Sequence, residues 1–253
     1  MKLRFVNPKH YYIEFLKFKN YILNPVYIES NKNTILQNIS GTWNIVVIKI
    51  ILTIIVGIVA TLIYDPVNKT TERWLELYST GTIFLLSIII FPLLEEIAFR
   101  LSLKFRQVYL SLTLGVLAYY MVTKGFYQTK LSNIDNHFEI RLMIGVLTIL
   151  IPYAIITSNP KIKSGLDRFW KRNFKWVFYF FCITFAFIHI FNYELNLKHL
   201  LLLPLITLPK LVSAITYGYV RMHYGFIYSL GLHMFSNSLG FVQIIYFSGG
   251  GTD

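Results

Sequence analysis

The amino-acid sequence predicts an all-α fold, a polytopic transmembrane helical bundle with about seven spans. Hydrophobic residues make up 55% of the 253 positions and charged residues only 14%, whereas soluble domains carry about 25% charged residues. The apolar residues also occur in long runs, and a run of about 18 or more is typical of a membrane-spanning helix. Because every backbone polar group in lipid needs an internal partner, these runs are expected to be helices.

Seven apolar runs reach or approach this length. They are residues 44–64, 80–94, 108–122, 140–157, 176–191, 200–219 and 225–247, with residues 97–103 extending the second. The chain therefore divides into three parts. These are a basic and aromatic N-terminal segment (1–43, cytoplasmic or interfacial), a transmembrane bundle (44–247) and a short flexible C-terminal end (248–253) rich in glycine.

The formal net charge of +12 does not indicate nucleic-acid binding, because the basic residues concentrate in alternate connections between the runs, as the positive-inside rule predicts. This bias places the N-terminus inside and the C-terminus outside. Lys49 and Lys210 are exceptions that fall within apolar runs. The single cysteine, Cys182, excludes an intramolecular disulfide. We expect a multi-pass integral membrane protein with the lipid bilayer as a partner and no nucleic acid. The Lys-, Asn- and Ile-rich composition favours a bacterial plasma membrane.

Two adjacent carboxylates, Glu95 and Glu96, lie in an apolar stretch and are followed by Arg100. A charged residue inside a membrane helix costs roughly 2–3 kcal/mol even on lenient scales, so a compensating interaction is expected. Glu96 and Arg100 are four residues apart and can pair on one helix face, whereas Glu95 is rotated by about 100° and is left unpaired. One paired and one unpaired carboxylate indicate a working acid or base. A structural ion pair at the membrane interface, with Glu95 solvated, explains this stretch equally well.

Two further runs carry histidines. His189 follows Phe185 by one helical turn on the same face, so Phe185 is expected to help fix its orientation. This histidine is a candidate base or ligand, although a lone histidine near a helix end is more often a satisfied interfacial residue. His233 and Asn237 project from one helix face and provide either donors for an oxyanion or hydrogen bonds between helices. Together the three runs supply the groups needed to activate a water and stabilise a tetrahedral intermediate.

These residues resemble the three motifs of the CAAX-protease/bacteriocin-processing (CPBP) family, which includes the type II CAAX prenyl endopeptidases. The matching patterns are Glu-Glu-x-x-x-Arg at residues 95–100, Phe-x-x-x-His at 185–189 and His-x-x-x-Asn at 233–237, with Tyr217, Gly218, Tyr219, Arg221 and Gly225 resembling the usual lead-in to the last motif. The resemblance covers about residues 80–247, the expected protease core. It departs from the family pattern at Leu101, where glycine is common, and in the two runs between the first and second motifs.

The resemblance implies an intramembrane endopeptidase that cleaves a membrane-associated substrate, prenylated or bacteriocin-like, without a cofactor. The implied roles are water activation for Glu95 and His189, organisation of the first motif for Glu96 and Arg100, and an oxyanion hole for His233 and Asn237.

Three other interpretations remain open. A zinc protease would use Glu95, His189 and His233 as ligands, a number that zinc accepts together with a water. A bacteriocin-immunity or membrane scaffold protein would have no activity, and a transporter would use the buried Glu and His as a proton relay. The sequence has no His-Glu-x-x-His, Gly-x-Gly-Asp or Gly-x-Ser-x-Gly motif, so other intramembrane protease types are unsupported.

Overall fold

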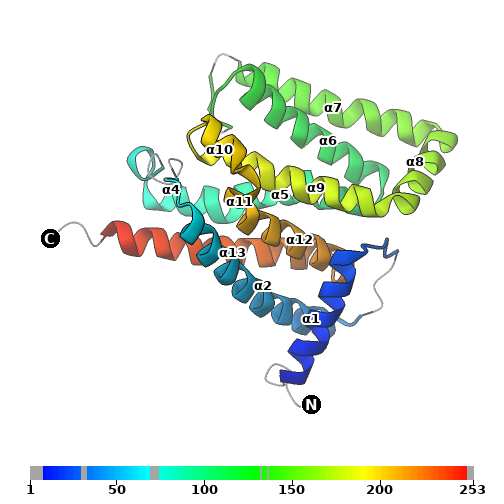
Figure 1. Cartoon of the computed structure of the whole chain (residues 1–253). Helices are drawn as coiled ribbons and strands as arrows, with labels where there is room; N and C mark the ends of the chain where they lie inside the picture. Colours follow the sequence, from blue (N-terminus) through cyan, green and yellow to red (C-terminus); the bar gives the residue numbers. More distant parts are fainter. Residues whose placement is uncertain (1–7, 30–32, 69–73, 132, 136, 250–253) are drawn as a thin grey trace.

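The computed structural model describes residues 8–29, 33–68, 74–131, 133–135 and 137–249, and every regular element in these ranges is a helix (Figure 1). The all-α fold class is therefore confirmed. The elements are α1 (Pro8–Leu23), α2 (Ile35–Ile63), α4 (Thr80–Phe84), η2 (Leu85–Ile90), α5 (Phe91–Phe99), η3 (Leu101–Leu103), α6 (Gln107–Met121), η4 (Val122–Phe126), α7 (Phe138–Ser158), α8 (Pro160–Arg172), α9 (Phe174–Ile188), η5 (His189–Asn192), α10 (Leu197–Leu201), α11 (Leu203–Ile206), α12 (Leu208–His223) and α13 (Phe226–Gly249). Of these, η2 and η4 are π-helices, and η3 and η5 are 3-10 helices.

Four helical stretches are long and apolar enough to cross a membrane. They are Ile35–Ile63, Thr80–Leu103, Phe138–Ser158 and Phe174–Asn192. The predicted runs at 108–122 and 200–219 are also helical, but α6 has only 15 residues and α12 only 16. The run at 225–247 lies in the 24-residue α13, which is not among these four. The structure thus supports a membrane protein with four candidate spans among the described residues.

Helix α1 and the start of α2 cover much of the predicted N-terminal segment. Helix α2 begins at Ile35, nine residues before the predicted start of the bundle, because Thr34 and Gln37 form a capping box. Helix α1 packs on the bundle through buried Glu14, whose carboxylate accepts hydrogen bonds from the hydroxyls of Tyr219 and Tyr224. Residues 1–7 of this segment and residues 250–253 of the predicted C-terminal end lie outside the described residues.

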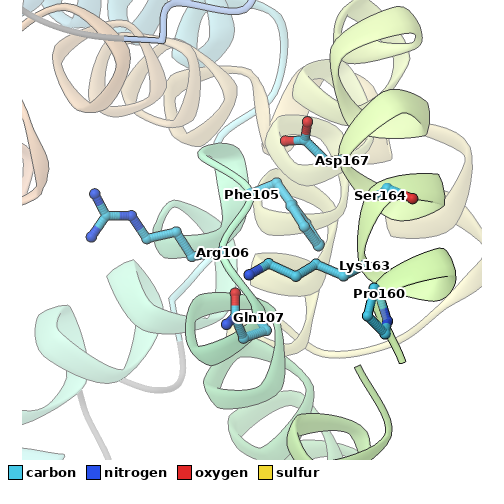
Figure 2. A pocket seen from close by; sticks show the side chains of 7 residues that line it. All are labelled: Phe105, Arg106, Gln107, Pro160, Lys163, Ser164 and Asp167. Atoms are coloured by element: carbon cyan, nitrogen blue, oxygen red, sulfur yellow. The ribbon is translucent and has the colours of Figure 1, made fainter. Parts of the chain in front are cut away.

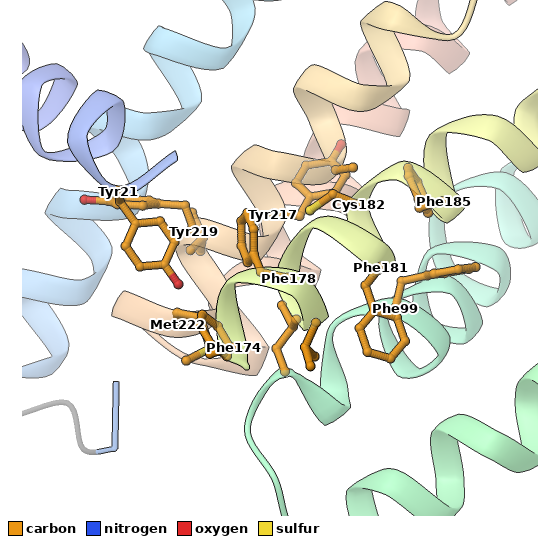
Figure 3. Close-up of a cluster of buried hydrophobic side chains, with 14 of the residues drawn as sticks. Tyr21, Phe99, Phe174, Phe178, Phe181, Cys182, Phe185, Tyr217, Tyr219 and Met222 are labelled. Carbon is orange, nitrogen blue, oxygen red and sulfur yellow. The ribbon is translucent and has the colours of Figure 1, made fainter. Parts of the chain in front are cut away.

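Helix α12 occupies the centre of the bundle, in contact with α2, α9 and α13. The aromatic cluster that holds it there includes Phe174, Phe178 and Tyr219 (Figure 3). The absence of a side chain at Gly218 allows close contact between α12 and α9, because a Cβ there would lie 2.7 Å from Phe178 Cε2. Helix α5 packs against α6, α9 and α13. These contacts bring the first motif (α5), the second (α9 and η5) and the third (α13) together around α12.

Candidate active site

A π-helical turn precedes helix α5, which carries Glu95 and Glu96. Thr80 to Phe99 is continuously helical, with the π-helical η2 between α4 and α5. In a π-helix each N–H bonds to the carbonyl five residues earlier, as Phe91 N does to Leu86 O. The next residue is Pro92, which has no N–H, so the carbonyl of Ser87 lacks this backbone donor. Asn237 supplies the missing donor from α13, with Nδ2 2.8 Å from Ser87 O.

Asn237 therefore connects the third motif to the turn that precedes the first. A side-chain amide has two N–H donors, and this bond uses one of them. The other is the donor that the predicted oxyanion hole would require. The structure thus gives Asn237 a hydrogen bond between helices, one of the two roles that its spacing allowed.

We expect Asn237→Ala to lower the free energy of unfolding by about 1–3 kcal/mol, because the Ser87 carbonyl would be left without a partner. Adding Pro92→Ala should restore most of this loss, since residue 92 then supplies a backbone N–H to the turn. Thermal or denaturant unfolding of the detergent-solubilised variants measures both effects. Ser238→Ala is the control, because its hydroxyl bonds only within α13, to Phe235 O. A double variant that remains as unstable as Asn237→Ala would contradict this interpretation.

Glu96 is fully buried and lies at the centre of a hydrogen-bonded network (0% exposed). Its Oε1 is 3.0 Å from His233 Nδ1 and 3.6 Å from Arg100 Nε. Its Oε2 is 2.5 Å from Ser229 Oγ, and the same hydroxyl is 2.9 Å from the carbonyl oxygen of Tyr217. Both oxygens of Glu96 are thus engaged, which makes this carboxylate an organising group rather than a base that accepts a proton from substrate.

Glu95 is placed differently, as its rotation from Glu96 predicts. Its side chain is 21% exposed, and its Oε2 lies 3.5 Å from His233 Nε2. This separation exceeds the usual N–H···O range of 2.7–3.2 Å, so the contact is loose and leaves Glu95 able to engage another group. The ring of Tyr217 stacks on that of His233, with the centroids 4.5 Å apart and an interplanar angle of 24°.

His233 bridges the two carboxylates through its two ring nitrogens. Because a carboxylate can only accept, the bond to Glu96 places a proton on His233 Nδ1. The Nε2 atom then faces Glu95, and a single proton in this contact resides either on the histidine or on the carboxyl. The pair can therefore transfer a proton to or from a third group that approaches Nε2 or Glu95.

His189 is oriented by the turn that precedes it. Its Nδ1 donates to the carbonyl oxygen of Phe185 at 2.7 Å, and the two rings lie 4.7 Å apart. Since Nδ1 carries the proton, Nε2 of the neutral ring is a free acceptor. Among the described residues His189 makes no direct hydrogen bond to Glu95; the histidine in contact with Glu95 is His233.

Arg100 lies between Glu96 and two aromatic rings. It is 2% exposed, and its guanidinium carbon lies 3.8 Å from the ring centroid of Phe185 and 5.3 Å from that of Tyr217. Neither of its terminal nitrogens, Nη1 and Nη2, has a hydrogen-bond partner among the described residues. The aromatic faces therefore supply much of the stabilisation that a buried cation requires.

Two participants in this network were not predicted as site residues. Ser229 lies four residues before His233 on the same face of α13, and this spacing is a signal in the sequence. Tyr217 was noted only as part of the lead-in to the last motif. Its stacking on His233 depends on how α12 packs against α13.

A cavity of about 470 Å³ lies away from these residues, between the connection that precedes α6 and helix α8 (Figure 2). It is lined by Phe105, Arg106, Gln107, Pro160, Lys163, Ser164 and Asp167, none of which belongs to the three motifs. In the described part of the chain no three His, Cys, Asp or Glu side chains are grouped so that they could hold a metal ion. The zinc-ligand set Glu95, His189 and His233 is therefore not assembled as a metal centre in this structure.

Comparison of the chain with models of protein families, with curated proteins and with solved structures finds no match.

Proposed function

We propose that this protein is an intramembrane endopeptidase of the CPBP type, which hydrolyses a peptide bond of a membrane-associated substrate. The observation that carries the proposal is the network in which His233 lies between Glu95 and Glu96, with Arg100 paired to Glu96. Four helices are long and apolar enough to cross a membrane, and Glu95 belongs to one of them. A charged side chain within a membrane helix costs free energy, and such residues usually have a function. The loose contact of Glu95 with His233 leaves its carboxylate available for one.

In the proposed reaction Glu95 accepts a proton from the attacking water, and the free Nε2 of His189 helps to hold that water. The hydroxide adds to the peptide carbonyl carbon. His233, with the shared proton on Nε2, donates a hydrogen bond to the resulting oxyanion, and the second N–H of Asn237 is a further donor. When the intermediate collapses the C–N bond breaks, and Glu95 returns its proton to the leaving amine. Glu96 and Arg100 keep His233 in place and do not contact the substrate. Removing one oxyanion donor typically lowers the rate by about 10²–10³-fold, so Asn237→Ala should retain partial activity, whereas Glu95→Ala should abolish it.

We further propose seven spans with the N-terminus inside a bacterial plasma membrane. Helix α6 continues into η4, and the 24 residues of α13 extend about 36 Å at 1.5 Å per residue, longer than a hydrocarbon core of about 30 Å. The sixth span would consist of α10, α11 and α12, interrupted near Pro204 and Pro209. Such breaks are tolerated in a membrane where surrounding helices bury them.

A second candidate function is a non-enzymatic bacteriocin-immunity or membrane scaffold protein. The observation that favours it is the bond from Asn237 to Ser87 O, which gives a residue of the third motif a structural task. In that case the network of Glu95, Glu96 and His233 would only join helices.

The deciding experiment reconstitutes the purified protein in liposomes with prenylated and plain hydrophobic peptides and follows cleavage by mass spectrometry. Wild type, wild type with a chelator, and Glu95→Ala are compared. Cleavage that survives the chelator and disappears in the variant is the expected result. Loss of cleavage with the chelator would indicate the zinc mechanism. If wild-type protein cleaves no peptide of the panel, the immunity or scaffold function becomes the better explanation.

A further inference from the structure

Helix α8 lies at the level where three candidate spans end. It follows the candidate span Phe138–Ser158 and precedes the candidate span Phe174–Asn192. The indole Nε1 of Trp170, on α8, donates to the carbonyl oxygen of Ser102 at 2.7 Å, and Ser102 lies at the end of a third candidate span, Thr80–Leu103. A helix held among the ends of membrane-spanning segments lies in the headgroup region, next to the hydrocarbon core.

Helix α8 also has the amphipathic pattern of a helix that lies along a membrane surface. Ile162, Leu166 and Phe169 share one face, because they are four and three residues apart. Leu166 packs against the core, whereas Ile162 is 39% and Phe169 53% exposed. The rest of the helix carries five basic residues, which are Lys161, Lys163, Arg168, Lys171 and Arg172. The exposed apolar side chains would contact acyl chains and the basic ones would face the headgroups.

The positive charge of this surface is only partly neutralised by carboxylates. Asp167 and Glu29 lie beside α8, and both pair with the same cation, Lys171, at 3.0 and 2.7 Å. In the part of the chain that the structure describes, the other four basic residues of α8 form no ion pair, nor does the exposed Arg106. These cations are therefore available to an anion from outside the protein.

The cavity of about 470 Å³ between α8 and the connection that precedes α6 brings two of these cations together (Figure 2). Arg106 comes from the connection and Lys163 from α8, and Figure 2 shows the Lys163 side chain extending toward Arg106. Of the five N–H donors of its guanidinium, Arg106 directs one at the hydroxyl of Tyr109, at 3.3 Å. Burial lowers the pKa of Lys104, and the cations Arg221 and Arg106 lower it further. The cavity thus combines positive charge with unused donors.

We infer that this cavity holds the phosphate of an anionic glycerophospholipid between Lys163 and Arg106. Basic pockets beside the ends of membrane helices suit such headgroups, and the lipid phosphate lies just outside the hydrocarbon core, at the level of α8. The acyl chains would run along exposed apolar residues near the cavity, Val108 of α6 (41% exposed) and Ile155 of α7 (51% exposed). A soluble phosphate compound would leave that apolar surface uncovered. Lipid binding here does not depend on peptide cleavage at Glu95.

The test is native mass spectrometry of the delipidated full-length protein in detergent, titrated with phosphatidylglycerol or phosphatidylcholine of the same acyl chains. Both lipids have a phosphate, but the choline cation cancels its charge. We expect wild type to bind one phosphatidylglycerol at least about tenfold more tightly than phosphatidylcholine. Each cation near a membrane surface contributes about fivefold in affinity. The double variant Arg106→Gln with Lys163→Gln should therefore bind phosphatidylglycerol about 25-fold more weakly and change little toward phosphatidylcholine.

The matched control is the double variant Lys161→Gln with Lys175→Gln. It also removes two positive charges from exposed residues of this surface, but neither residue lines the cavity. Its preference for phosphatidylglycerol should equal that of wild type. An equal loss of affinity in the control and in the cavity variant would show that only the general positive potential attracts the lipid, and would overturn the site. The unfolding temperature verifies each fold, and Lys163→Gln alone, at an exposed position, serves if the double cavity variant does not fold.

Glycerol 1-phosphate separates a lipid from a soluble phosphate compound at this site. It has the phosphate but no acyl chains, so it should not displace bound phosphatidylglycerol at equal concentration. Equal affinity for the two would assign the cavity to a soluble phosphate compound and overturn the lipid. Equal affinity of wild type for the two phospholipids would also overturn the inference. A preference that the cavity variant loses and the control keeps supports it.

Discussion

Glu95→Gln should lower the rate of peptide hydrolysis by about 10²–10⁴-fold, the range that general-base catalysis contributes, without changing the fold. Glutamine has nearly the same size as glutamate, but its amide cannot accept the proton of the attacking water. Both oxygens of Glu96 are occupied by His233, Arg100 and Ser229. Glu95 is partly exposed and its contact with His233 is loose, so it is the carboxylate of the pair that can act on substrate.

Single-turnover cleavage in proteoliposomes measures this effect, and the unfolding temperature of each variant verifies the fold. Glu139→Gln is the matched control, because Glu139 is an exposed glutamate in the first turn of α7 and should leave the rate unchanged. Glu96→Gln should instead lower stability, since its buried bonds to Arg100 and His233 would weaken. If Glu95→Gln keeps the wild-type rate while Glu96→Gln loses it in a folded protein, the two glutamates have the opposite roles.

Arg100→Leu should destabilise the protein by about 3–5 kcal/mol, the loss typical when one member of a buried ion pair is removed. Glu96 would remain as a buried carboxylate with only His233 and Ser229 beside it. The loss includes the cation–π contact of the guanidinium with Phe185, at 3.8 Å. Arg100 is 2% exposed, so water cannot replace either interaction.

A double-mutant cycle isolates the pair. The double variant Glu96→Gln with Arg100→Leu should be less destabilised than the sum of the two single variants, because no unpaired charge remains buried. Denaturant unfolding in detergent micelles gives the free energies. Arg106→Leu is the control, since Arg106 is exposed and surface changes usually stay within about 0.5 kcal/mol. Strict additivity of the two single variants would show that Glu96 and Arg100 do not stabilise each other.

Several parts of the candidate site follow from spacing along one helix. Glu96 and Arg100 were expected to pair because they are four residues apart, and the structure places them 3.6 Å apart. Phe185 was expected to orient His189 one turn later, and its carbonyl accepts the Nδ1 hydrogen bond. Helical geometry determines such contacts regardless of how helices pack. The functional roles assigned to these residues remain predictions.

Contacts between helices could not be predicted in this way. The contact of Glu95 with His233 of α13 was not predicted from spacing, since it joins two helices. The bond from Asn237 to Ser87 O depends on a π-helical turn and a proline, and periodicity does not reveal their combined effect. The predicted run at 44–64 begins nine residues after the start of α2, because Gln37, Asn38, Ser40 and Thr42 interrupt the apolar pattern.

The sequence by itself determined that this protein is all-helical, that it contains runs apolar enough to cross a membrane, and which polar residues lie within those runs. These properties depend on local composition and on helical periodicity, which a single chain segment carries. Only the tertiary structure decided which polar groups meet: His233 with both glutamates, Asn237 with Ser87, and Lys49 with Tyr217. The reason is that each of these contacts joins two helices, and its geometry is set by the packing of α12 and its neighbours rather than by either sequence segment alone.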